Sequence, residues 1–410
     1  MKVNLIVLPQ PYIAHPMKHQ PLGILYLAAA IEQKGYEVII TDLRIGEEIP
    51  KADVYGIGAR TPDYKTAVRI AIEIKVKFGK PVILGGVHCT AVPDSIDYVF
   101  DSMVLGEGEL AILDILKDIE NGELKKCYKR ELIADIDTIP FPARHLMSYD
   151  GIVSRQLLDS GEPATSIITS RGCRAGCLFC ASKLMWTQKV RYGSIQRTVI
   201  ELFRIMETYN IRHFKFQDDT LTLSKKRLLA LCEAIKPLKI EWMANARVDT
   251  VDVEMLSMMK EAGCSWVEFG IETASQTALN ILHKGTTIER GEKAIKDAKS
   301  VGLKVKALFM IGLPGEDNNI GEQDIEFLKR TQPDRTILAT FCPLPGCAIY
   351  NEPKKFGMEI LTKDFDEYLT NLGLMEGEEE KGFIYTHPIM SREEMVRERG
   401  KVLEFIGSRK

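Results

Sequence analysis

The sequence has no long apolar run, no concentrated stripe of Lys and Arg, and no cysteine pattern typical of secreted disulfide proteins. No apolar run reaches the ~18 residues of a membrane span, and residues 1–8 are too short for the apolar region of a signal peptide. The formal net charge of −3 argues against a nucleic-acid-binding surface. The nine cysteines are odd in number and mostly scattered. We therefore expect a protein of the reducing cytoplasm that binds neither a membrane nor nucleic acid.

The chain is long enough for two or three domains, with 410 residues of ordinary globular composition. In the first part, short apolar runs alternate with amphipathic stretches. Strands are predicted at residues 3–8, 38–40, 54–58, 81–84 and within 98–105, with helices at 22–34, 64–78 and 110–119. This alternation predicts a parallel doubly wound sheet, whose ligands bind beyond the carboxyl ends of the strands. No Gly-x-Gly-x-x-Gly follows the first strand, which weakens a dinucleotide interpretation.

A second series of strands and helices begins at Thr165. Strands are predicted at residues 167–169, 213–216, 240–244, 266–269, 305–311 and 335–341. Six such units form a partial barrel, with polar and glycine-rich loops at the strand ends where barrel enzymes place their chemistry. We expect four segments: a first domain at 1–132, a proline-punctuated linker at 133–164, the partial barrel at 165–348 and a C-terminal region at 349–410.

The C-terminal region loses the alternation of strands and helices. It contains an acidic loop at residues 375–381, then a helix from Ser391 to about Ile406 that begins with capping-box character. We expect this region to close the open side of the barrel.

Three cysteines, Cys173, Cys177 and Cys180, lie within eight residues directly after the first strand of the barrel. Gly172 and Gly176 make this loop flexible enough to wrap around a ligand. A structural zinc site normally has four ligands, whereas an incompletely ligated iron–sulfur cluster keeps one iron open. A zinc knuckle and three unrelated core cysteines are the alternatives.

The spacing Cys-x3-Cys-x2-Cys, with Phe179 before the last cysteine, resembles that of the radical S-adenosylmethionine (SAM) superfamily. The resemblance implies that Cys173, Cys177 and Cys180 hold a 4Fe–4S cluster, whose fourth iron is chelated by the amino and carboxylate groups of SAM. Arg174 stands where the family often has proline, which is a minor departure.

Three segments before the cysteines, residues 20–28, 85–88 and 106–109, resemble the cobalamin-binding domain that precedes many radical SAM barrels. The resemblance implies that cobalamin is bound by residues of these segments and of the loop at 59–64, namely Pro21, Leu22, Gly23, Thr61, Gly85, Gly86, Val87, His88, Gly106, Glu107 and Gly108. The Asp-x-His-x-x-Gly motif that supplies a histidine to cobalt in some cobalamin proteins is absent. His15, His19 and His88 lie in loops, where a lone histidine is more often solvated or hydrogen-bonded than a ligand. We expect the lower face of the corrin to pack on the loop at residues 11–20, with the tail base displaced.

The resemblance also assigns residues to SAM. Asp218 and Asp219 follow the second barrel strand, where the family contacts the SAM amino group, although the usual Gly-Gly-Glu is absent. Arg247 and Glu272 are candidates for the carboxylate or ribose, and Gly312 would pack against adenine or the substrate. A structural ion pair between Glu272 and Arg247 and a helix N-cap at Asp218 are the alternatives.

Other residues are expected to be structural. Cys127, Cys232 and Cys264 are predicted to be small core residues, as is Met310. Cys342 and Cys347 flank a turn at the barrel mouth. We favour a packing role for them over a functional one.

Together these features resemble the cobalamin-dependent (class B) radical SAM methyltransferases, in which two bound cofactors supply the difficult chemistry. The resemblance implies methylation of an unactivated sp3 carbon and requires an electron donor for the cluster. For the substrate we expect a protein or peptide, with the α-carbon of a glutamine in methyl-coenzyme M reductase as a candidate. A small-molecule methyltransferase and a cobalamin-dependent cyclase are alternatives. A non-catalytic corrinoid or iron–sulfur sensor and a radical SAM enzyme without cobalamin are the other rivals.

Overall fold

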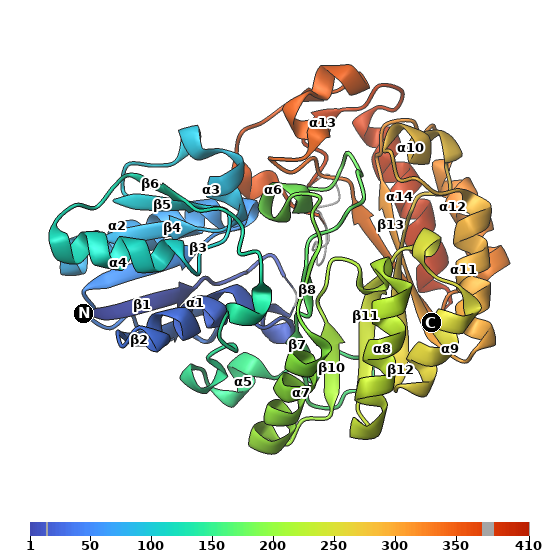
Figure 1. Cartoon of the computed structure of the whole chain (residues 1–410). Coiled ribbons are helices and arrows are strands. Elements are labelled where there is room, and N and C mark those ends of the chain that lie inside the picture. The colour runs from blue at the N-terminus through green and yellow to red at the C-terminus, as the bar shows by residue number, and fades with distance from the viewer. Residues whose placement is uncertain (14, 371–380, 410) are drawn as a thin grey trace.

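Two parallel sheets lie side by side in the computed structural model, and the strand pair β8–β9 lies between them (Figure 1). The structure describes residues 1–13, 15–370 and 381–409. The predicted acidic loop at 375–381 falls almost entirely outside the described residues. Each sheet has six strands, and both fold-class predictions, a doubly wound sheet and a partial barrel, are confirmed.

The N-terminal sheet has the strand order β2-β1-β3-β4-β5-β6, with every neighbouring pair parallel. Its strands are β1 (Lys2–Val7), β2 (Glu37–Asp42), β3 (Val54–Gly58), β4 (Val82–Gly85), β5 (Ser102–Leu105) and β6 (Cys127–Lys129). Apolar residues of α1 (Leu22–Gln33) and α4 (Ala111–Asn121) pack on one face. Those of α2 (Tyr64–Phe78) pack on the other face, and the short α3 (Val87–Ala91) follows β4. This three-layer arrangement places the loops after β1, β3 and β4 at the carboxyl edge of the sheet.

The second sheet has the order β14-β13-β12-β11-β10-β7 and is the predicted partial barrel. Its strands are β7 (Ala164–Ile167), β10 (His213–Phe216), β11 (Glu241–Ala246), β12 (Cys264–Glu272), β13 (Lys304–Ile311) and β14 (Arg335–Thr340). The connecting helices are α7 (Ile195–Tyr209), α8 (Lys225–Ile235), α9 (Val253–Glu261), α10 (Gln276–Ile281), α11 (Ile288–Ser300) and α12 (Ile320–Thr331). In Figure 1, α7, α8, α9, α11 and α12 lie along the outer side of the sheet, and α10 lies at its upper end.

The segment between the two sheets is irregular, as predicted, and contains α5 (Tyr149–Ile152). After β14 come α13 (Ala348–Asn351), the strand pair β15 (Glu359–Ile360) and β16 (Tyr385–Thr386), and α14 (Arg392–Gly407). The predicted capping box of α14 is confirmed: Ser391 and Glu394 cap each other's backbone. α14 packs against α12 and against β13 and β14, so it extends the outer layer rather than the open side of the barrel. The turn at Phe365–Glu367 contacts the N-terminal sheet layer instead, through α2 and the turn at Thr61–Asp63.

One core prediction is wrong. Cys127 lies exposed on the edge strand β6, whereas Cys232 and Cys264 are buried as expected. An edge strand leaves alternate side chains open to solvent, and the short sequence around Cys127 carried no periodicity to reveal this.

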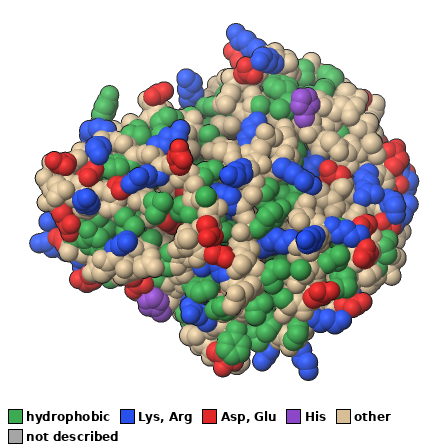
Figure 2. All heavy atoms as spheres, in the orientation of Figure 1, with side chains coloured by type: hydrophobic (Ala, Val, Ile, Leu, Met, Phe, Trp, Pro, Cys, Tyr) green, Lys and Arg blue, Asp and Glu red, His purple; other side chains and the backbone are tan. Residues whose placement is uncertain are grey.

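Among the described residues, no helix combines the length and the apolar character needed to cross a bilayer. Side chains of both charge signs occur across the face drawn in Figure 2, with hydrophobic side chains between them.

Candidate active site

The cysteine loop begins where β7 ends. β8 (Ser170–Arg171) pairs with β9 (Arg191–Tyr192), and this small antiparallel pair directs the chain from Gly172 into the cysteines. Gly172 has φ +100°, and a Cβ there would lie 2.6 Å from the Lys189 carbonyl oxygen, so only glycine fits. All three predicted cysteines line one cavity of about 280 Å³ at the carboxyl end of the barrel.

The donor set of this loop fits a cluster better than a single ion. None of the three thiols is in a disulfide. No three His, Cys, Asp or Glu side chains within the described ranges converge on one metal position, as the ligands of a zinc ion would. Burial raises the pKa of the Cys180 thiol to about 11, so a cationic metal centre is needed to favour the thiolate. Three thiols spread around a cavity suit the corner irons of a 4Fe–4S cluster.

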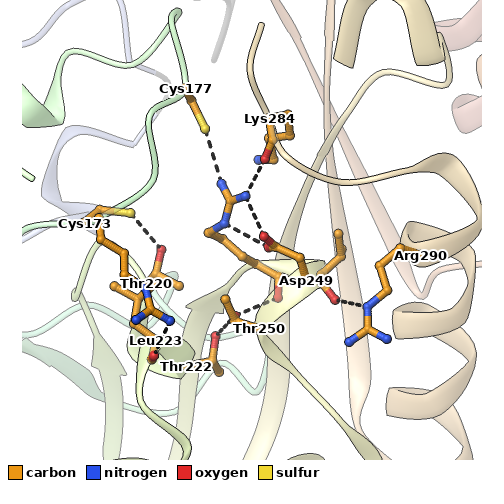
Figure 3. Close-up of polar contacts among 12 residues, drawn as sticks. Cys173, Cys177, Thr220, Thr222, Leu223, Asp249, Thr250, Lys284 and Arg290 are labelled. Atoms are coloured by element: carbon orange, nitrogen blue, oxygen red, sulfur yellow. Dashed lines mark hydrogen bonds and ion pairs between the residues drawn. The ribbon is translucent and has the colours of Figure 1, made fainter. Parts of the chain in front are cut away.

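Arg247 extends from the end of β11 into this cavity. Its Nη1 donates to Cys177 Sγ at 3.3 Å, and its Nε and Nη2 donate to the two Asp249 carboxylate oxygens at 2.9 Å each. Its Nη2 also donates to the backbone oxygen of Lys284, and Figure 3 draws the contacts to Cys177, Lys284 and Asp249 as dashed lines. The bidentate pair with Asp249 fixes the guanidinium plane beside the sulfur. The predicted alternative, an ion pair between Arg247 and Glu272, is wrong, because each residue has its own partner.

The partner of Glu272 is Lys284, a residue that the sequence analysis did not single out. The buried Lys284 Nζ donates to Glu272 Oε1, and both residues line the cavity. Glu272 has φ +72° at a register shift in β12, a strained conformation for a residue with a side chain. A Cβ on Gly270 would lie 2.4 Å from Glu272 Oε1, so this glycine leaves room for the pair. Arg247, Lys284, Glu272 and Asp219 together give the cavity charges of both signs, which suits the amino and carboxylate groups of SAM.

The two adjacent aspartates have different surroundings. Asp218 is buried and accepts from Thr169 N at 3.2 Å, Thr169 Oγ1 at 2.9 Å and Ser170 Oγ. It therefore fixes the backbone before the cysteine loop, does not line the cavity and caps no helix. Asp219 does line the cavity and accepts from Gly172 N at 3.2 Å and Ser182 Oγ at 2.8 Å. Only Asp219 is placed to contact a ligand.

Gly312 lies away from the cavity. Its φ is +94°, and its carbonyl accepts from Tyr385 Oη at 2.7 Å, so it contacts the C-terminal region. Its N–H and that of Leu313 donate to Glu316 Oε2 at 2.8 and 3.0 Å. Neither adenine nor a substrate is needed to explain this glycine.

The buried carboxyl group of Glu316 should make the free energy of unfolding depend on pH. Burial raises the pKa of its carboxyl to about 8. Because the folded-state pKa exceeds the unfolded value, the folded state binds the proton more tightly, and stability falls as pH rises towards 8. The slope is ~1.4 kcal/mol per pH unit. We expect Glu316→Gln to remove this slope, since an amide oxygen still accepts hydrogen bonds from the two N–H groups.

Urea unfolding between about pH 6 and about pH 7.5 should show wild type losing ~2 kcal/mol relative to the variant. The exposed Glu359, changed to Gln, is the control, and parallel pH profiles for wild type and Glu316→Gln would contradict the assignment.

A second cavity, of about 170 Å³, lies at the carboxyl edge of the N-terminal sheet. Of the predicted residues, Pro21, Gly86 and Val87 line it. Its other lining residues come from the ends of β1 and β3 and from α1: Ile6, Val7, Leu8, Gln10, Ile24, Gly58, Ala59, Arg60 and Asp63. The sequence could have indicated several of these residues, because they lie at or just after the ends of two predicted strands. This cavity and the cysteine cavity share no lining residue.

The edge of this sheet fits a large flat ligand. Gly86 has φ +101°, and a Cβ there would lie 2.7 Å from the Ala59 carbonyl oxygen, so the backbone is bare at the strand end. The side-chain oxygen and nitrogen of Gln20, next to Pro21, are buried without a hydrogen-bond partner. Backbone without a side chain, together with a side-chain amide that has no hydrogen-bond partner, suits a corrin, whose rim carries amide groups.

His88 and Thr61 do not line this cavity, although their neighbours Arg60 and Val87 do. The His88 ring is fully buried, stacks on Tyr64 with centroids 4.2 Å apart and meets Phe365 edge-on at 4.6 Å. Its Nδ1 lies 3.3 Å from Thr61 Oγ1, and burial lowers the pKa of the imidazole to about 4. The histidine therefore joins the C-terminal region to the N-terminal sheet. The other predicted residues that do not line this cavity are Leu22, Gly23, Gly85, Gly106, Glu107 and Gly108.

Glu107, in the loop after β5, joins the N-terminal sheet to the β8–β9 strand pair. Its carboxylate accepts from Arg171 Nη1 at 2.6 Å, Arg191 Nη1 at 2.7 Å and the Ile133 N–H at 2.8 Å. Arg171 also donates to Glu109 Oε1 at 2.5 Å. All four charged side chains are buried, and we call them the Glu107 network. Because Arg171 lies two residues before Cys173, this network ties the Gly106–Gly108 loop to the cysteine loop.

Comparisons with known proteins match both parts of the chain. Residues 167–328 match the model of the radical SAM superfamily, and residues 14–116 match that of the B12 binding domain. An uncharacterised methyltransferase of Pyrococcus horikoshii is 33% identical, covering 90% of this chain and 87% of its own. Cytidylyl-2-hydroxyethylphosphonate methyltransferase of Streptomyces wedmorensis is 28% identical, covering 74% and 70%.

Solved structures show the same fold. The radical SAM methyltransferase TsrM of Kitasatospora setae aligns with a TM-score of 0.73 at 17% identity, covering 99% of this chain and 89% of its own. The cobalamin-dependent SAM radical enzyme OxsB aligns with a TM-score of 0.68 at 20% identity, covering 87% and 56%. The chain therefore belongs to the cobalamin-dependent (class B) radical SAM methyltransferases, enzymes that use a 4Fe–4S cluster, SAM and cobalamin.

Proposed function

We propose that this enzyme methylates an unactivated sp3 carbon, with Cys173, Cys177 and Cys180 as the cluster ligands. The observation that carries the proposal is the pair of strand-end cavities, one of which is lined by all three cysteines. When bound, SAM at the cluster supplies the oxidant that removes a hydrogen atom, and cobalamin supplies the methyl group. The proposed domain division, with a first domain at 1–132 and a barrel at 165–348, gives each cofactor its own sheet.

The residues of the cysteine cavity have distinct proposed roles. Arg247 and Lys284 bind the carboxylate of SAM or its ribose, and Asp219 accepts from its amino group. Glu272 holds Lys284, and Asp218 positions the loop without touching a ligand. Residues of the N-terminal cavity, among them Pro21, Gly86 and Val87, lie against cobalamin. An external one-electron donor reduces the cluster.

For the substrate we infer a small molecule. Two relatives are named as methyltransferases of small molecules, a cytidylyl-phosphonate and bacteriochlorophyllide d. The α-carbon of a glutamine in methyl-coenzyme M reductase is the peptide alternative. A cyclase is a second candidate, because a relative 25% identical over 85% of this chain is named as an anaerobic magnesium-protoporphyrin IX monomethyl ester cyclase.

Product analysis tests these alternatives. The enzyme, loaded with both cofactors without oxygen, is incubated with reductant, methyl-labelled SAM and either a small-molecule extract or the reductase peptide. A methyltransferase forms 5′-deoxyadenosine, S-adenosylhomocysteine and labelled product in equal amounts. A cyclase forms 5′-deoxyadenosine without S-adenosylhomocysteine, and that result would refute methyl transfer. Label found in the peptide would identify the peptide, and not a small molecule, as the substrate.

A further inference from the structure

The inner face of the barrel carries lysines next to the cysteine cavity. Glu268 on β12 lines that cavity, and its register partner on β13 is Lys306. Lys215 Nζ of β10 lies 2.8 Å from Glu268 Oε2, and Lys306 Nζ lies 3.6 Å from Glu268 Oε1. All three side chains are buried. One carboxylate at the cavity wall is therefore shared by two ammonium groups.

A third ammonium group comes from the other sheet. Lys18 ends the short turn Pro16–Lys18, in the loop that follows β1. Burial lowers the pKa of Lys18, and the charges of Lys306, Lys215 and Arg335 lower it further. The charge of Glu268 acts in the opposite direction, but Lys18 forms no ion pair with any carboxylate in the described part of the chain. The neighbouring His19 Nδ1 lies 3.4 Å from Gln217 Nε2 at the end of β10, which holds this loop against the barrel.

Positive charge exceeds negative charge in this region. Asp159 is the second carboxylate, 3.1 Å from Lys306 Nζ and 2.7 Å from Arg335 Nη1. Lys215, Lys306 and Arg335 thus share two carboxylates, Glu268 and Asp159, and Lys18 adds a fourth positive charge beside them. His19 adds no charge near neutral pH, because burial and Lys215 lower the pKa of its imidazole to about 4. Like charges at low dielectric repel strongly unless a counter-ion joins them, so the arrangement favours a bound anion.

We propose that the barrel interior binds an oxyanion of the substrate, either a carboxylate or a phosphoryl group, between Lys18, Lys215 and Lys306. The identification of this anion as part of the substrate rests on the proposed function; the anion site itself does not. An anion held here places the rest of its molecule beside Glu268, Asn245 and Leu308, which line the same cavity as the three cysteines. Lys18 comes from the sheet that binds cobalamin, so the anchor joins elements of both cofactor sites.

Lys18 is the residue to change, because Lys215 and Lys306 hold Glu268 and their loss would leave a buried carboxylate unpaired. The variants are Lys18→Gln, Lys18→Arg and, as a matched control, Lys34→Gln at the exposed end of α1. Equilibrium dialysis measures the binding of labelled inorganic phosphate and labelled succinate to the enzyme loaded with both cofactors. The cluster is kept oxidised and SAM is saturating, so the SAM carboxylate occupies its own site.

We expect one anion per chain, with affinity at least tenfold weaker in Lys18→Gln, retained in Lys18→Arg and Lys34→Gln, and falling with salt. Binding of phosphate alone identifies a phosphoryl group, and binding of succinate alone identifies a carboxylate. If neither anion binds, or if Lys18→Gln binds as wild type does, the proposal is overturned. Iron, cobalt and 5′-deoxyadenosine formation are measured on the same preparations. Normal values with no anion site refute this inference alone, whereas a lack of cofactors or turnover despite anion binding refutes the proposed function alone.

Discussion

Replacing Cys173, Cys177 or Cys180 singly by alanine should remove most of the iron and lower reductive SAM cleavage by roughly 100-fold or more. Each thiol lines the same cavity, and a cluster that already leaves one iron to SAM has no spare protein ligand. The measurements are iron and sulfide content after reconstitution without oxygen, and 5′-deoxyadenosine formed with reductant. Cobalt content should stay at the wild-type level, because the cavity proposed for cobalamin shares no lining residue with this one.

The matched control is Cys127→Ala. Cys127 is exposed on the edge strand β6, so its loss should change neither iron content nor SAM cleavage. Wild-type iron in any of the three cavity variants would show that its thiol is not a ligand. Loss of cobalt together with iron would point to misfolding.

Replacing Arg171 by methionine should lower the free energy of unfolding by ~3–5 kcal/mol. The Arg171 guanidinium is 6% exposed and neutralises Glu107 and Glu109, so its removal leaves buried carboxylates short of a counter-ion. Arg191 still pairs with Glu107 but makes no contact with Glu109. Urea unfolding of the apoprotein at neutral pH measures the loss.

The control is Arg130→Met, which removes a side chain 53% exposed from its pair with Asp114. Exposed pairs contribute ~0.2–1 kcal/mol, so this variant should stay close to wild type. Replacing Arg171, Glu107 and Glu109 together by apolar residues of similar size should recover part of the loss, because no charge then remains unpaired. Equal losses in Arg171→Met and Arg130→Met would show that the Glu107 network contributes no more to stability than an exposed ion pair does.

Much of the architecture was predictable because it depends on local patterns. Apolar runs of strand length, alternating with helical periods, determine two sets of parallel strands, and parallel strands place their following loops at a common edge. The cysteine loop was predictable for the same reason, since all three thiols lie within one short segment. The capping box of α14 likewise involves residues three apart.

The sequence by itself determined which cofactor loops this protein has, because each loop follows its own strand. Only the tertiary structure decided what the individual side chains in those loops do. Asp218 and Asp219 are neighbours in sequence, yet one fixes backbone and the other lines the cavity. Glu107 lies in a phrase typical of a cobalamin loop but pairs with arginines 64 and 84 residues later. Lys284 and Lys18 carried no local signal at all. Their roles depend on charges that come together only when distant strands pair, and that pairing sets which buried carboxylate each cation neutralises.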